Sequence, residues 1–238
     1  MIRAAVLLVV LSVVAPAAAS AQWYVGVYLG ANTTTPADIT VDLPDRHTQL
    51  TYEDVAFEAR PFAAPQYYGY RFGKIFGDTR RFGLEVELIH LKVIAKTADA
   101  YAVNGVEDGV GVAEVSRMDE RVQGYAMTHG LNFALVNFVM RRPIGSGRAV
   151  LVGRAGAGPT LPHAETTIAM VTREQYEYGG LGVQLSGGAE FALGSRFSVL
   201  GEYKFTRARP EIAVDGGTGR MTARCHQIAF GLAIRLSR

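Results

Sequence analysis

The chain has 238 residues, of which 24 are basic and 22 acidic, so its formal net charge of +2 gives no electrostatic case for binding nucleic acid. Hydrophobic residues make up 49% of it, and it contains 27 glycines, 11 tyrosines and 11 phenylalanines. Cys225 is the single cysteine, which excludes a fold held by intramolecular disulfides.

The first 21 residues have the features of a secretory signal peptide. Arg3 supplies a positive start, and an uncharged apolar run follows up to Val14. Ala19, Ser20 and Ala21 provide the small residues that a cleavage site needs. The apolar run is shorter than the roughly 20 residues of a membrane-spanning helix. We expect cleavage after residue 21, which leaves the mature domain as residues 22–238 with a net charge of +1.

The mature chain shows the alternation that is typical of β-strands. No apolar run after residue 21 approaches the roughly 18 residues that suggest a helical membrane span. In residues 22–30, Trp23, Val25, Val27 and Leu29 fall on one face, and glycines and tyrosines fall on the other. In lipid, only helices and closed barrels satisfy every backbone polar group. An exported chain that is rich in glycine and aromatic residues but lacks helical periodicity therefore predicts a closed β-barrel.

Seven further segments predict strands. They are residues 66–76, 82–95, about 125–142, about 149–165, 180–191, 196–206 and about 224–238. In the segment 82–95, Leu84, Val86 and Leu88 oppose Glu85 and Glu87. Carboxylates facing hydrocarbon are too costly, so the glutamate face must line the interior. The same reasoning predicts an interior charge network of Arg71, Glu85, Glu87, Glu190, Glu202, Lys204 and Arg235.

Two of the predicted strands depart from this pattern. Asn137 shares its face with Leu131, Phe133 and Leu135, and Arg154 shares its face with two valines. A polar residue on an apolar face predicts either a β-bulge or a face that is covered by protein rather than by lipid.

The connections between the predicted strands differ in length. Short ones lie at 77–81, 143–148 and 194–196, and long ones at 31–65, 96–124, 166–174 and 212–219. Short periplasmic turns and long extracellular loops are typical of outer-membrane barrels. We therefore predict an all-β fold, an eight-stranded antiparallel up-and-down barrel in the bacterial outer membrane, monomeric and with both termini in the periplasm. The interior of eight strands is filled by side chains, so no pore is expected.

The sequence lacks the common catalytic motifs G-x-S-x-G and H-E-x-x-H, and it has no phosphate-binding glycine loop before a helix. The histidines carry more information, because four of the five lie toward the predicted outer ends of strands. Neutral imidazole together with carboxylate binds divalent metal ions or relays protons. His163 and Glu165 share a face by their spacing, and with His129 they form our candidate metal-binding set. His90 shares the face of Leu88 and is expected near the lipid headgroups.

Several segments together resemble a known family. They are residues 87–93 (Glu-Leu-Ile-His-Leu-Lys-Val), 129–132 (His-Gly-Leu-Asn) continuing to 143, 156–165 (Gly-Ala-Gly-Pro-Thr-Leu-Pro-His-Ala-Glu) and 201–206 (Gly-Glu-Tyr-Lys-Phe-Thr). These segments look like the spaced signatures of small outer-membrane barrel proteins that are often labelled lipid A oxidase. The resemblance covers most of the chain from the third predicted strand onward.

This resemblance implies an enzyme of the outer leaflet that uses dioxygen to oxidise the proximal glucosamine of lipid A to 2-aminogluconate. A divalent metal ion is the cofactor we expect, and lipopolysaccharide is the expected partner. By motif match, the candidate catalytic residues are Glu87, His90, His129, Asn132, His163, Glu165, Glu202 and Lys204.

Two other functions are compatible with the sequence. A non-catalytic barrel could stabilise the envelope or present its long loops to other molecules, because a packed interior requires no chemistry. A soluble periplasmic lipocalin-like barrel is disfavoured, because it needs apolar residues inside, where this pattern places glutamate and lysine.

Overall fold

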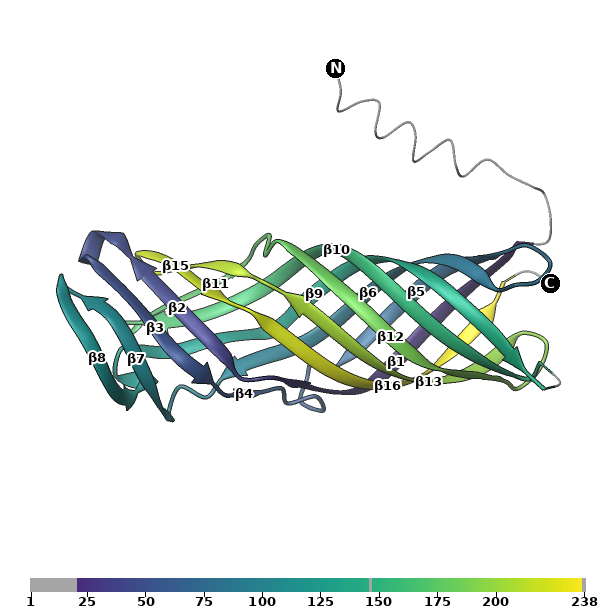
Figure 1. Cartoon of the computed structure of the whole chain (residues 1–238), viewed down its shortest axis with the longest axis horizontal. Helices are drawn as coiled ribbons and strands as arrows, with labels where there is room; N and C mark the ends of the chain where they lie inside the picture. Colours follow the sequence, from purple (N-terminus) through teal and green to yellow (C-terminus); the bar gives the residue numbers. More distant parts are fainter. Residues whose placement is uncertain (1–20, 146, 237–238) are drawn as a thin grey trace, which may run out of the picture.

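In the computed structural model, which describes residues 21–145 and 147–236, eight long antiparallel strands form a closed barrel (Figure 1). These strands are β1 (Gln22–Thr34), β5 (Tyr68–Phe76), β6 (Phe82–Ala95), β9 (Val122–Ile144), β10 (Ala149–Ile168), β12 (Leu181–Ala192), β13 (Phe197–Ala208) and β16 (Ala223–Arg235). The ring closes where β16 pairs with β1. The predicted eight-stranded barrel is confirmed. Residues 1–20 of the predicted signal peptide lie outside the described residues.

The two faces of the barrel wall differ in polarity, as the alternation predicts. Large apolar side chains are exposed on the outer face of all eight strands, among them Val27, Tyr70, Val86, Phe138, Leu151, Val183, Val199 and Phe230. Polar and charged side chains are buried in the interior, among them Arg71, Glu85, Glu87, Arg154, Gln184, Glu190, Glu202 and Lys204. No helix within residues 21–145 and 147–236 is both long enough and apolar enough to cross a membrane.

The interior charges form one connected network. Arg71 Nε donates to Glu87 Oε1 at 2.8 Å, and the same guanidinium pairs with Glu202. Arg154 Nη1 donates to Glu202 Oε2 at 3.0 Å, and Lys204 pairs with Glu87. Glu85, Glu190, Arg141, Asn137, Gln184, Tyr24 and Tyr28 complete the network. Six of the seven predicted members therefore form an interior network, in which opposite charges meet within hydrogen-bonding distance as burial requires. The prediction was wrong for Arg235, whose Nη1 instead donates to the carbonyl group of Ser195 at 3.4 Å near the turn that precedes β13.

At Asn137 and Arg154 the two strands pair regularly, and both side chains are covered by protein. Asn137 and Arg154 both face the interior, together with apolar neighbours such as Phe133 and Val152. The register of β9 against β10 is continuous through both positions, and its irregularities lie further along, beyond Pro162. Of our two predicted explanations, the covered face holds.

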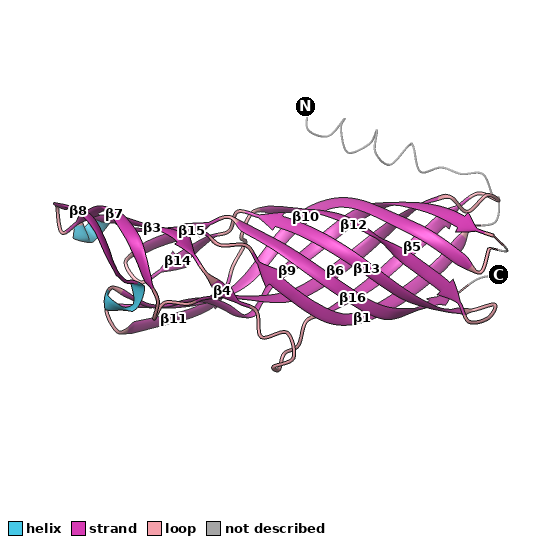
Figure 2. Cartoon of the chain, turned by 60° about the horizontal axis from the view of Figure 1, so that its bottom comes forward, coloured by secondary structure: helices cyan, strands magenta, loops and turns pink. Residues whose placement is uncertain are grey.

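The long connections fold into an extension of the barrel, defined here as the second sheet together with β11 and the adjoining ends of β9 and β10 (Figure 2). The second sheet has the order β14-β15-β2-β3-β7-β8. Its strands are β2 (Ala37–Leu43), β3 (Thr48–Val55), β7 (Ala100–Glu107), β8 (Val110–Arg117), β14 (Glu211–Val214) and β15 (Gly217–Met221). The remaining elements are β4 (Phe57–Glu58), β11 (Val171–Tyr176) and the 3-10 helices η1 (Pro44–Arg46) and η2 (Met118–Glu120). The sequence pattern predicts no strands in these connections.

Apolar side chains fill the interior of the extension. Ile39, Leu50, Tyr52, Tyr125 and Ile212 are among its buried members, drawn from β2, β3, β9 and β14. Burial raises the pKa of Tyr52 to about 12, so this hydroxyl stays neutral. The cluster continues into the end of the barrel interior nearest the extension, so apolar side chains close the barrel above its charged layer.

Candidate functional site

The barrel wall separates the predicted site residues into two groups. Glu87, Glu202 and Lys204 are buried inside the barrel within the charge network. The other five occupy the outer side of the wall, where β6, β9 and β10 lie next to each other. These five are His90, His129, Asn132, His163 and Glu165. The three interior residues already pair with each other or with Arg71, and a catalytic role for them stays a prediction.

His90 is held on the outer wall by a specific set of contacts. Its Nδ1 lies 2.9 Å from Asn132 Oδ1, and its ring stacks on Tyr68 with centroids 4.8 Å apart. Gly130 makes this possible, since it adopts a φ of +102° and a Cβ there would lie 2.4 Å from His90 Nδ1. The loop before β5 covers this face, because Lys92 Nζ donates to two of its carbonyl groups. His90 Nε2 is buried and has no hydrogen-bond partner within the described residues.

A shallow hollow of about 240 Å³ lies beside His90 on the outer wall. Its lining residues are Tyr68, Tyr70, Leu88, Ile89, His90, Asn132, Phe133, Ala134 and Leu161. Most of this lining is apolar, and the orphan ring nitrogen of His90 is a polar group that a ligand could satisfy. We call this feature the outer-wall hollow.

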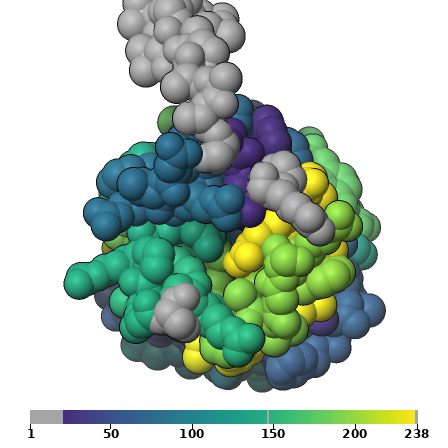
Figure 3. Space-filling model, turned by 90° about the vertical axis from the view of Figure 1, so that its right-hand side faces the viewer, coloured from purple at the N-terminus to yellow at the C-terminus, as the bar shows by residue number. Residues whose placement is uncertain are grey.

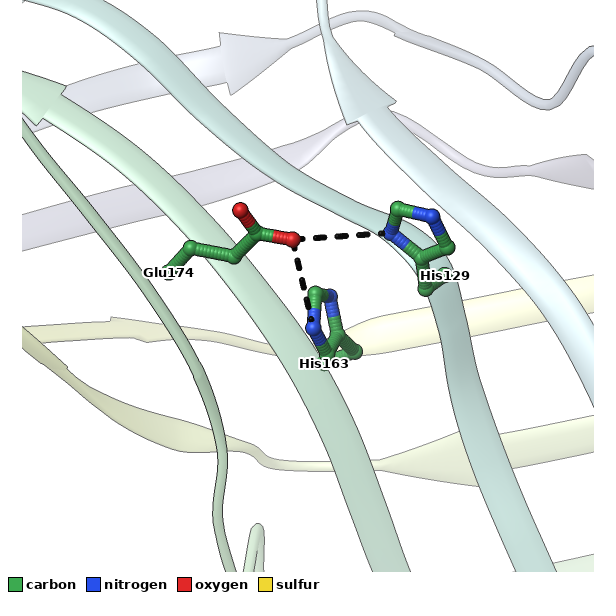
Figure 4. A group of neighbouring side chains, drawn as sticks. All are labelled: His129, His163 and Glu174. Atoms are coloured by element: carbon green, nitrogen blue, oxygen red, sulfur yellow. Dashed lines mark ion pairs between the residues drawn. The ribbon is translucent and has the colours of Figure 1, made fainter.

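Next to the hollow, two histidines and one glutamate converge (Figure 4). His163 Nε2 lies 3.4 Å from Glu174 Oε1, and His129 Nδ1 lies 3.8 Å from the same oxygen. The two imidazole rings meet edge to face with centroids 4.7 Å apart. One ligand atom from each residue lies within 4.8 Å of the others, so these three side chains could hold a metal ion. We call this group the outer-wall cluster.

Each member of the outer-wall cluster comes from a different strand. His129 lies on β9, His163 on β10 and Glu174 on β11. The hairpin of β10 and β11 positions the glutamate, because His163 pairs with Tyr176 and Glu174 lies two residues before Tyr176 on the same face of β11. The His163 side chain is 10% exposed, while those of His129 and Glu174 are about half exposed. The cluster thus combines one buried side chain, His163, with two more exposed side chains that can adjust their positions.

The structure brings together two of the three residues of the predicted metal set, His129 and His163. Glu165 accepts a hydrogen bond from Thr128 Oγ1 at 2.8 Å and is not one of the three converging residues. Glu174 takes its place beside the two histidines. The alternation in residues 171–176 is weak, and pairing across strands cannot be read from a single sequence, so sequence reasoning missed this carboxylate.

A protein-family model matches almost the whole chain. The family model described as outer membrane protein beta-barrel domain matches residues 4–235. The chain belongs to this family. It is therefore an integral outer-membrane protein, and the apolar outer face of the barrel contacts lipid.

Solved structures of other outer-membrane barrels are similar to this family member in fold. Neisserial surface protein A shares 8% sequence identity, with 91% of this chain and 99% of that chain covered and a TM-score of 0.44. The Yersinia pestis attachment invasion locus protein Ail, crystallised with a heparin analogue, shares 10% identity at a TM-score of 0.38, with 91% and 97% covered. A search of curated proteins gives no match.

Membership of the family places the outer-wall cluster relative to the membrane. Leu88 and Tyr70 are exposed on the outer wall and belong to the lipid-facing band, and they border the outer-wall hollow. Tyr176, Tyr178 and Leu181 are exposed next to the cluster, which is the aromatic composition found at a membrane interface. The cluster thus lies at the edge of the lipid-facing band, toward the extension.

Proposed function

We propose that this protein is a dioxygen-dependent oxidase of lipid A, with the extension on the cell surface and the short turns in the periplasm. The observation that carries the proposal is the outer-wall cluster. Two histidines and one carboxylate at the lipid boundary are the ligand set that iron(II) oxygenases use, with coordination positions left open. In this orientation the cluster faces the leaflet in which lipopolysaccharide lies.

The outer-wall cluster can accept a metal ion with small movements. Ligand nitrogen and oxygen atoms bind such ions at about 2.0–2.2 Å, so the three ligand atoms must approach one another by about an ångström. His129 and Glu174 are half exposed and free to turn toward the buried His163. A bound iron(II) ion would supply the activation of dioxygen, and the substrate would reach the cluster along the wall from the lipid.

The overall oxidation is balanced with dioxygen as the acceptor. The hemiacetal at C1 of the proximal glucosamine loses two electrons and two protons to dioxygen, which gives a lactone and hydrogen peroxide. Water then opens the lactone to 2-aminogluconate. The reaction requires a free hydroxyl group at C1, so the lipid A acted on must lack a phosphate there.

The outer-wall hollow provides the binding surface for such a substrate. Its apolar side chains would contact acyl chains, and the neutral His90 ring, which donates through Nδ1, would accept a hydrogen bond from a sugar hydroxyl group at Nε2. Asn132 Oδ1 accepts a hydrogen bond from His90 Nδ1 and so fixes the orientation of the ring. Asn132 is thus a positioning residue in this proposal.

Lipid A mass spectrometry tests the activity. A strain that lacks the gene should lose the species that is heavier by one oxygen atom, and expression of the intact protein should restore it. Expression of the His163→Ala or Glu174→Gln variant should restore less than about a hundredth of it, because losing a metal ligand removes the activating ion. The matched control is His226→Gln, on the opposite side of the barrel, which should restore it fully. An unchanged lipid A profile in the deletion strain would refute the oxidase.

Metal binding is tested separately by electron paramagnetic resonance of manganese(II) added to the folded protein. We expect one bound ion in the intact protein and at least a tenfold weaker affinity in His129→Ala. Because protons compete with metal ions for imidazole nitrogen atoms, the affinity should also fall in acidic buffer. Equal binding by the intact protein and the variant would exclude the outer-wall cluster as the ligand set.

One observation favours the second function, surface interaction without catalysis. Among the described residues, strand β8 pairs only with β7 and forms one open edge of the second sheet, with Val110 and Val115 exposed. Such an edge can accept a strand from another protein. Loss of surface binding in a Val112→Pro variant whose lipid A profile is unchanged would support this function.

A further inference from the structure

The end of the barrel opposite the extension is strongly basic, and Figure 3 looks onto it. The three short connections and their flanks carry the exposed residues Arg80, Arg81, Arg142, Arg148 and Arg196, while Asp78 is the one acidic residue of the turns. No ion pair formed between described residues involves Arg81 or Arg142. Unpaired guanidinium groups at a membrane boundary attract anions.

A large open hollow adjoins two of these arginines on the outer wall. It has a volume of about 1010 Å³, and Arg81 and Arg142 lie at its turn end. The other lining residues are Thr79, Phe82, Met140, Arg141, Pro143, Leu151, Val152, Gly153, Gly187 and Gly188. Arg141 points inward and pairs with Glu190 at 2.7 Å, so it is not available to a ligand outside.

Two glycines form the floor of this hollow. Strand pairing places Phe82, Met140, Gly153 and Gly187 in one row across β6, β9, β10 and β12. A Cβ atom at Gly187 would have nothing within 4 Å, and one at Gly153 would only reach 3.9 Å contacts. Neither glycine is needed for backbone conformation or close packing. Tyr203 comes after Gly187 in the row, so the two positions without side chains leave a furrow between Met140 and Tyr203.

The furrow leads from the charged end into the lipid-facing band. Gly187 lies in the middle of β12 (Leu181–Ala192), whereas Arg81 and Arg142 lie beside the turns. A cationic mouth at the membrane surface and an apolar channel toward its centre match the two parts of a phospholipid. An acidic peptide would also be attracted by the arginines, but it would leave the apolar furrow within the membrane unfilled.

We propose that this furrow is a binding site for an anionic phospholipid of the leaflet at the short-turn end. Arg81 and Arg142 bind the headgroup phosphate, and one acyl chain lies over Gly153 and Gly187. Guanidinium groups bind phosphate through paired hydrogen bonds, and a net negative headgroup has no ammonium group to oppose them. The site is independent of the outer-wall cluster and of lipid A chemistry.

Native mass spectrometry of the refolded full chain in detergent tests the site. The probes are phosphatidylglycerol and phosphatidylcholine with identical acyl chains. We expect phosphatidylglycerol to bind at least about tenfold more tightly. Arg81→Gln with Arg142→Gln should reduce this ratio to about twofold or less. The matched control is Arg148→Gln with Arg196→Gln, which removes the same charge from the same end but outside the furrow, and should keep the ratio.

A second variant tests the furrow itself. Gly187→Leu has room for its side chain and should weaken phosphatidylglycerol about tenfold, while inorganic phosphate at millimolar concentration should not displace the lipid from the intact protein. Each variant is first shown to be folded by its heat-dependent shift in gel migration. Equal binding of the two lipids, equal loss in both arginine pairs, unaltered binding by Gly187→Leu or displacement by phosphate would each overturn the proposal.

Discussion

The barrel and the extension use the same alternation of side chains with opposite polarity. In the barrel, Val86 and its outward neighbours face lipid while Glu87 and its partners fill the interior. In the extension, Ile39 and Leu50 fill the interior while polar side chains such as Glu53 and Asn104 meet outside. The surrounding medium, which is lipid for the barrel and water for the extension, therefore decides which face of a strand is buried.

The two regions share strands β9 and β10. Asn137 and Arg154 mark the charged layer of the barrel, whereas Tyr125 and Ile168 on the same strands belong to the apolar cluster of the extension. The inward-facing side chains of each of these strands therefore change from polar to apolar along the strand. This change explains why these two strands gave the least regular pattern in the sequence.

The largest expected effect comes from removing a charge inside the barrel. Glu87→Gln leaves Lys204 without its closest carboxylate and removes one of the partners of Arg71, which should cost about 3–5 kcal/mol of the free energy of unfolding. Urea unfolding followed by the fluorescence of Trp23, the single tryptophan, measures it.

The matched change in the extension should have little effect on the free energy of unfolding. Glu114→Gln removes a carboxylate 3.0 Å from Arg121, but this glutamate is half exposed, so the expected loss is below about 1 kcal/mol. Comparable losses for Glu87→Gln and Glu114→Gln would show that the interior network does not hold the barrel together.

The next effect concerns outward side chains. Val86 and Val115 are both more than half exposed, but Val86 faces lipid and Val115 faces water. Val86→Arg should destabilise the protein by about 2–4 kcal/mol near the membrane midplane. Val115→Arg should change the free energy of unfolding by less than about 0.5 kcal/mol. Unfolding in lipid bilayers compares the two, and equal effects would contradict the assignment of the lipid-facing band.

The smallest effect lies within the second sheet. Thr40 and Thr51 are paired across β2 and β3, with hydroxyl oxygens 2.9 Å apart. A double-mutant cycle of Thr40→Ala and Thr51→Ala should give a coupling of about 0.2–1 kcal/mol. Limited proteolysis of the extension provides the measurement, and an absent coupling would mean that the two hydroxyl groups do not interact in solution.

Much of the barrel was predictable from the sequence, because Glu85 and Glu87 alternate with apolar residues that must face lipid. The extension was not predictable in this way. Its strands β7 and β8 expose most of their side chains, so residues 100–117 lack an apolar face that alternation could reveal. Their order in the sheet depends on contacts between connections that are far apart in the chain.

The candidate site was predictable in part. His129 and His163 could be assigned to the outer ends of two successive predicted strands, which made them candidates for one site. Glu174 could not be added, since it depends on the register of a hairpin in which Thr167 pairs with Thr172. Residue spacing describes one strand, and a metal site is built across several.

The length of β9 has a mechanical consequence. This strand runs unbroken for 23 residues, which is about 75 Å at 3.3 Å per residue, even though the apolar band of such barrels is only about 25 Å tall. A tether that is continuous with the wall transmits force and orientation instead of swinging freely. An antibody bound to the tip of the extension should thus keep a fixed distance and angle to the bilayer.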